Sequence, residues 1–78
     1  MRARYDEEGV GHLMLSKPEI DHLPHEALRR IKAYSENVIG LNGGSRDYSF
    51  YGSSSMNLAI EICRFHHLTM ESVLDAVP

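Results

Sequence analysis

The segment NVIGLNGGSRDYSFY, residues 37–51, decides between two folds for this chain. In the first interpretation Val38 and Leu41 close an apolar helical stripe, and Asn42-Gly43-Gly44 ends the helix, because glycine accepts the left-handed backbone found there. In the second, Asn42-Gly43 is the turn of a β-hairpin between NVIGL and RDYSFY.

The residues before this segment favour the helix. Pro24 suits the first turn of a helix, where its missing N–H costs nothing. Apolar or small residues then recur at helical spacing through to residue 41. They are Ala27, Leu28, Ile31, Tyr34, Ser35, Val38 and Leu41. We therefore predict one long helix from about residue 24 and treat the hairpin as the alternative.

A second helix is expected after the segment. Ser53, Ser54 and Ser55 are good N-caps, and an apolar stripe follows them. Its members are Met56, Ala59, Ile60, Cys63 and His67. Thr69 resembles the cap of a short third helix.

These elements predict a mainly α fold: an antiparallel helical hairpin, a short C-terminal helix and one short N-terminal β-strand within residues 9–15, provided that the strand finds a neighbour. The alternative is an α+β fold with a hairpin at 37–51. Residues 1–8, which are charged and show no period, are expected to be a loose arm. Residues 9–78 are expected to be a single small helical domain.

Composition narrows the functional classes. The chain has 78 residues and a net charge of −3, which argues against a sequence-independent nucleic-acid binder. Its single cysteine excludes an intramolecular disulfide and favours a reducing compartment. The start lacks the apolar run of a signal peptide, and no stretch reaches the roughly 20 apolar residues of a membrane span. We expect a cytoplasmic protein with no membrane partner.

Histidine and cysteine residues lie at two helix ends that an antiparallel hairpin would bring together. Imidazoles and a thiolate that converge in this way could bind a structural zinc ion. The candidate ligands are His22, His25, Cys63, His66 and His67. In the competing interpretation Cys63 is a small core residue and the histidines interact with the end of a helix dipole. No cofactor is therefore assigned.

Residues 42–53 have the composition of a binding loop. Tyrosine rings supply rigid contact area, and serine, glycine and asparagine adapt to a partner. The candidate partner-binding residues are Arg46, Tyr48, Phe50 and Tyr51. They predict a non-enzymatic interaction module, regulatory or inhibitory, that docks on a larger protein. The alternative is that the rings cap the core and the serines cap the helix.

The same loop also allows an anion site at the start of the second helix. Backbone N–H groups and serine hydroxyls there could hold a phosphate or a nucleotide. The residues concerned are Arg46, Gly52, Ser53, Ser54 and Ser55. The segment lacks the lysine of a Walker phosphate loop.

No catalytic set emerges, so we do not expect an enzyme. The carboxylates are spaced for exposure, and a thiol on an apolar stripe is inert. DNA binding is also disfavoured, because the segment after the 66–69 turn carries no arginine or lysine. The second helix is apolar around much of its circumference. Its apolar surface must pack against other protein surface, which predicts a homodimer with this helix in the shared core.

Overall fold

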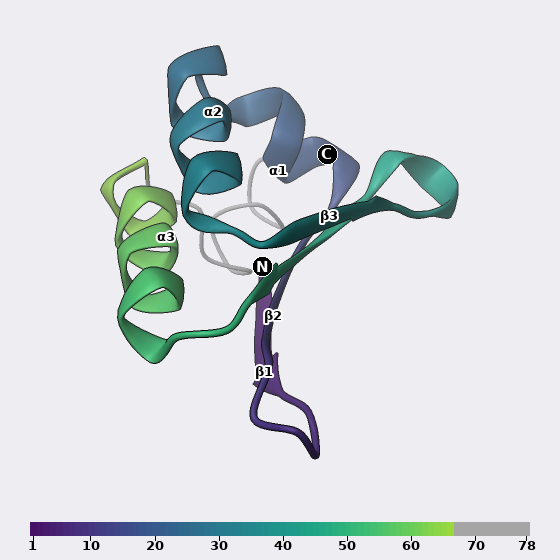
Figure 1. Ribbon diagram of the computed structural model, residues 1–78. Helices are drawn as coiled ribbons and strands as arrows, with labels where there is room; N and C mark the ends of the chain where they lie inside the picture. The colour runs from purple at the N-terminus through teal and green to yellow at the C-terminus, as the bar shows by residue number, and fades with distance from the viewer. Residues whose placement is uncertain (67–78) are drawn as a thin grey trace.

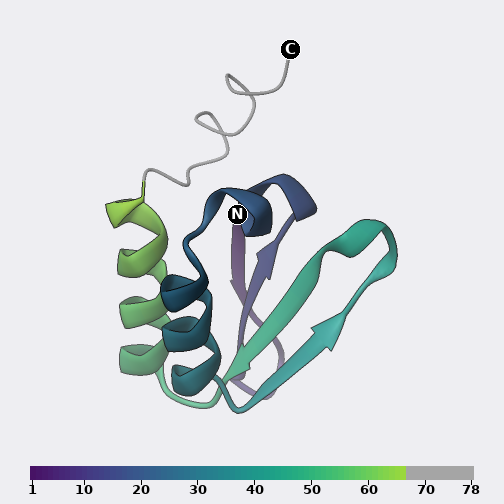
Figure 2. The same cartoon turned by 90° about the horizontal axis from the view of Figure 1, so that it is seen from above.

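The computed structural model describes residues 1–66, which form a four-stranded sheet with helices packed on one of its faces (Figures 1 and 2). The elements are β1 (Arg2–Tyr5), β2 (Gly11–Leu15), α1 (Lys17–His22), α2 (His25–Tyr34), β3 (Asn37–Gly40), the 3-10 turn η1 (Asn42–Gly44), β4 (Arg46–Phe50) and α3 (Ser53–Phe65). The fold is therefore α+β, and the prediction of a mainly α protein is wrong.

The sheet is antiparallel throughout, with strand order β1-β2-β4-β3. Two local hairpins, β1–β2 and β3–β4, are joined by the pairing of β2 with β4. Leu13 of β2 and Val38 of β3 are both register partners of Tyr48 in β4. The centre of the sheet is thus built from segments that lie far apart in the sequence.

The hairpin at residues 37–51, the alternative to one long helix, is the arrangement found. Helix α2 ends at Tyr34, and Ser35 is already extended with ψ 157°. Gly43 and Gly44 have φ values of 79° and 84°, which suit glycine in a turn between strands. Two features override the helical spacing: the β-branched pair Val38-Ile39 favours a strand, and the alternation in RDYSF places both rings on one face.

Residues 1–8, predicted to be a loose arm, contain β1 and the turn that follows it. β1 supplies the neighbour that the predicted N-terminal strand, present as β2, requires. The carboxylate of Asp6 accepts hydrogen bonds from the backbone N–H groups of Glu8 and Val10, at 2.9 and 3.0 Å. These hydrogen bonds of the Asp6 side chain order the connection to β2. They were not predicted, because residues 1–8 were interpreted only as a charged segment without a period.

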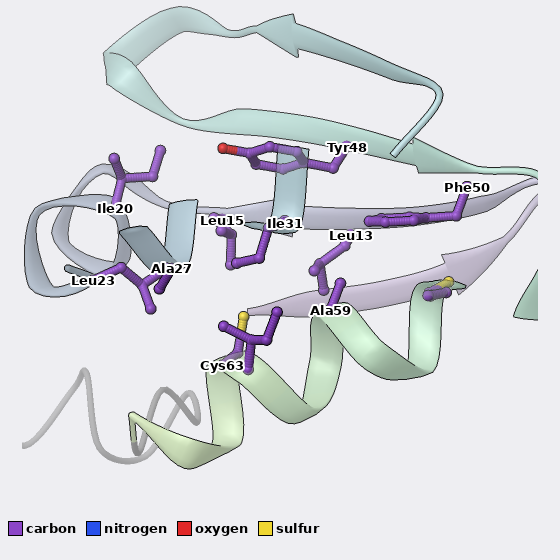
Figure 3. Packing of buried hydrophobic residues seen from close by; sticks show 12 residues of the cluster. Leu13, Leu15, Ile20, Leu23, Ala27, Ile31, Tyr48, Phe50, Ala59 and Cys63 are labelled. Carbon is purple, nitrogen blue, oxygen red and sulfur yellow. The ribbon is translucent and has the colours of Figure 1, made fainter. Parts of the chain in front are cut away.

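The core lies between the sheet and the helices (Figure 3). Leu13, Leu15, Tyr48 and Phe50 point from the sheet towards α2 and α3. The helices contribute Ala27, Ile31, Met56, Ala59, Ile62 and Cys63. Helix α3 begins at Ser53, within the range that the serines predict, and packs on both β2 and β4. The third helix predicted from Thr69 lies outside the described residues.

Helix α1 is anchored by a buried carboxylate. Ser16 and Glu19 have the Ser-x-x-Glu spacing of a capping box, and both of its hydrogen bonds are present at the start of the helix. Glu19 is only 1% exposed, and its carboxylate also forms an ion pair with the N-terminal ammonium group of Met1. The start of the chain is thereby tied to the first helix.

Candidate functional site

The aromatic residues of the predicted docking loop divide between the core and the surface. Tyr48 and Phe50 are 1% and 0% exposed, whereas Tyr51 is 71% exposed. Because they alternate along β4, the two buried rings share the face that packs on the helices. The structure does not present the predicted residues Arg46, Tyr48, Phe50 and Tyr51 as one exposed surface.

The residues predicted to bind an anion are also not brought together. Gly52 is the N-cap of α3, and Ser53, Ser54 and Ser55 form its first turn, where no side chain caps the helix. Arg46 lies at the opposite end of β4. Gly52 follows Arg46 by six positions along nearly extended chain, a span of about 20 Å. Arg46 therefore cannot assist an anion bound at this helix start.

The predicted zinc ligands do not converge in the part of the chain that the structure describes. Cys63 is fully buried, and its burial raises the pKa of the thiol to about 11. A protonated thiol is a poor metal ligand. His22, His25 and His66 belong to three different helix ends, and His67 lies outside the described residues. No group of three or more His, Cys, Asp or Glu side chains within residues 1–66 could hold a metal ion.

The two edges of the sheet differ in character. β1 carries Arg2 and Arg4, and charged side chains on an edge strand oppose pairing with another chain. β3 has the sequence NVIG, which contains no charged residue. Its Ile39 is 48% exposed. β3 is therefore the edge that can accept a further strand.

The backbone of β3 has outward-facing groups at two positions. The N–H of Leu41 donates to the carbonyl of Ser45 at 2.8 Å, which fixes the alternation of bonds between β3 and β4. Val38 and Gly40 consequently direct their N–H and C=O groups away from β4. The side-chain oxygen of Asn37 accepts from the N–H of Val38 at 3.0 Å. Around Gly40, an added Cβ would meet no atom within 4 Å.

A cleft of about 610 Å³ lies beside this edge, between the end of α2 and the β3–β4 hairpin. Figure 2 shows the hairpin reaching away from α2. The residues that line the cleft are Lys32, Ser35, Glu36, Asn37, Val38, Arg46 and Tyr48. Half-buried Val38 supplies apolar surface, whereas the Tyr48 ring is buried and contributes little surface to the cleft. The Arg46 guanidinium donates to the Tyr48 hydroxyl at 3.4 Å. The volume lies within the range of ligand-binding clefts, and the cleft is open to solvent rather than enclosed.

We define Lys32, Glu36, Val38, Gly40, Arg46 and Tyr48 as the edge site. The prediction of partner-binding residues includes only Arg46 and Tyr48 among these. Glu36, Val38 and Gly40 were missed because the helical interpretation of residues 24–41 places them on a helix. Lys32 does lie on α2, and its place beside the edge depends on how the chain continues from α2 into β3. The available signal was the β-branched pair Val38-Ile39 directly before Asn42-Gly43.

A second charged cluster lies on the face of the sheet turned away from the helices. The imidazole of His12 contacts Asp6 at 3.0 Å and Asp47 at 3.2 Å, one through each ring nitrogen. The hydrogen bond to Asp6 raises the pKa of His12, and Asp47 acts in the same direction. Partial burial of the ring lowers this pKa, as does the charge of Arg4, but neither cancels the effect of Asp6. Through these two contacts the His12 ring links the β1–β2 turn to β4.

The stability of the fold is expected to decline with rising pH because of the contacts of His12 with Asp6 and Asp47. The pKa of His12 is raised in the folded state, so its contribution is fully present below about pH 6.5, the usual pKa of an unfolded histidine. It is lost as the pH rises through the folded pKa. Thermal melts should therefore show the stability difference between wild type and His12→Ala shrinking from pH 5.5 to pH 8.5. If the stability difference between wild type and His12→Ala stays constant across this range, His12 does not stabilise the fold through its charged form.

Comparison with known proteins identifies no relative: no protein-family model matches the chain, and neither a curated protein nor a solved structure matches it. None of the helices within residues 1–66 has the length and apolar character needed to cross a membrane.

Proposed function

We propose that the protein is a non-enzymatic interaction module that binds an extended segment of a partner protein along β3. The observation that carries this proposal is an edge strand without charged residues, lying beside a cleft of about 610 Å³. Extended peptides bind such edges by adding a strand to the sheet.

The bound segment obtains affinity from the backbone and specificity from the cleft. Its main chain pairs with the outward N–H and C=O groups of Val38 and Gly40. The side-chain oxygen of Asn37 accepts from the N–H of Val38, so this side chain must move before a bound segment can pair with that N–H. Alternate side chains of the segment then enter the cleft on one face and lie against Ile39 on the other.

The charges of the cleft favour one direction of the bound strand. Lys32 and Arg46 form no ion pair within residues 1–66. Arg46 is the register partner of Gly40, whereas Glu36 precedes β3, about 13 Å away along the strand. An acidic side chain is therefore favoured near Gly40 and a basic one near Glu36. Whether a bound segment runs parallel or antiparallel to β3 then depends on the order of its acidic and basic residues.

A matched pair of variants at Gly40 tests the proposal on peptides selected from a displayed library against the full chain. Gly40→Pro removes the outward N–H and adds a ring to the edge without removing a bond to β4. Gly40→Ala adds a methyl group in open space and keeps the N–H. We expect the proline variant to bind at least about tenfold more weakly and the alanine variant to bind like wild type. Affinity is measured by calorimetry, with circular dichroism to verify folding.

Two outcomes would overturn this function. One is equal binding by the folded proline and alanine variants, which would place the peptide elsewhere. The other is a dimer in native mass spectrometry that Gly40→Pro dissociates. That result would assign the edge to a second copy of the chain, in a dimer formed through β3 and not through the second helix as the sequence predicts.

A further inference from the structure

A second hollow lies at the other edge of the sheet, on the face turned away from the helices. Its volume is about 270 Å³. Its lining consists of Arg2, Ala3, Arg4, His12 and Met14, from β1 and β2. The hollow shares no residue with the edge site and is separated from it by the width of the sheet.

Two guanidinium groups flank this hollow from the same strand. Arg2 and Arg4 are two positions apart on β1, so their side chains leave the same face about 7 Å from each other. Arg2 is the register partner of Met14, and Arg4 that of His12. Neither guanidinium forms an ion pair or hydrogen bond within residues 1–66. Their donors are available to a ligand.

The neighbouring carboxylates do not compensate the two arginines by direct contact. Asp6 and Asp47 are both engaged with the ring of His12, at 3.0 and 3.2 Å. The His12 ring lines the hollow, and both of its nitrogens are engaged by these carboxylates. Met14 adds an apolar wall opposite Arg2. The hollow therefore presents two guanidinium groups with unused, forked hydrogen-bond donors in a protein of net charge −3.

We infer that this hollow binds a phosphate monoester group, held between the guanidinium groups of Arg2 and Arg4. A phosphate monoester presents three oxygens and nearly two negative charges at neutral pH, so it can accept from both arginine forks together. A carboxylate has two oxygens and one charge and satisfies one fork. The volume of the hollow admits the phosphate and the first atoms of its carrier.

The proposal is tested by NMR titration of the full chain with inorganic phosphate, phosphoserine and adenosine monophosphate at constant ionic strength. Saturable shifts are expected at the side-chain N–H signals of Arg2 and Arg4, with none for unphosphorylated serine. Arg2→Gln and Arg4→Gln should each weaken binding about tenfold. Arg29→Gln, an equal change of charge at an exposed position of α2, should leave the affinity unchanged. Tighter binding of phosphoserine or of the nucleotide identifies the carrier.

A linked titration gives an independent readout. A bound dianion beside His12 should raise the pKa of its ring further in the wild type but not in the Arg2→Gln, Arg4→Gln double variant. Shifts that grow linearly with phosphate without saturating would overturn the inference. So would an equal loss of affinity in Arg29→Gln, because that result means attraction by net charge alone.

Discussion

Replacing Phe50 by alanine is expected to lower the free energy of unfolding by about 3–5 kcal/mol. The ring is fully buried in β4 and faces the helices within the main core cluster. Its removal leaves a cavity where the sheet meets the helical layer. A domain of this length is stable by roughly 4–12 kcal/mol, so the loss is a large share of the total.

Tyr51 is the matched control, since it is the next residue and also aromatic. It is 71% exposed, so Tyr51→Ala should change stability by no more than about 0.5 kcal/mol. Urea unfolding followed by circular dichroism compares the two variants. Equal unfolding midpoints would mean that Phe50 does not belong to the core. The same pair therefore also tests whether the aromatic segment is structural or a docking loop.

Replacing Glu19 by alanine is expected to cost about 2–4 kcal/mol, the second largest effect. The buried carboxylate accepts from the backbone N–H and the hydroxyl of Ser16, both at 2.9 Å. It also pairs with the N-terminal ammonium group. Its loss removes half of the capping box of α1 and leaves a largely buried cation without this carboxylate.

Asp21 in the same helix provides the control for charge. Its carboxylate pairs with Lys17 at 2.7 Å, but both side chains are more than half exposed. Asp21→Ala should therefore cost no more than about 0.5 kcal/mol. Urea midpoints of the two variants measure the difference. If Asp21→Ala is as destabilising as Glu19→Ala, burial does not determine the importance of these carboxylates.

The fold could be predicted from sequence only where the signals are local. The capping box at Ser16 and the start of α3 near Ser53 depend on neighbouring residues, and both are present. Residues 37–41 carry a helical period and a β-branched pair together. The choice between them is made by strand pairing, because Val38 pairs with Tyr48 of β4 and Tyr48 pairs in turn with Leu13 of β2. Spacing along the chain does not contain this information.

Most residues of the two candidate sites could not be predicted from the sequence, because strand pairing in the sheet brings them together. Arg46 and Tyr48 were singled out by residue type, but the edge site also requires that β3 be the last strand of the sheet. Arg2 and Arg4 belong to a segment predicted to be loose. Their shared face becomes evident only when β1 is paired with β2. A topology must be known before either site can be recognised.

The pairing of β2 with β4 has a consequence for biosynthesis. It joins positions 35 residues apart in sequence, as the contact of His12 with Asp47 shows. A ribosome adds about 5–20 residues per second, so the N-terminal hairpin waits about two to seven seconds for its central neighbour. During that interval Leu13 and Leu15 lack the layer that later covers them. The sheet can therefore close over these two leucines only after β4 and α3 have been synthesised.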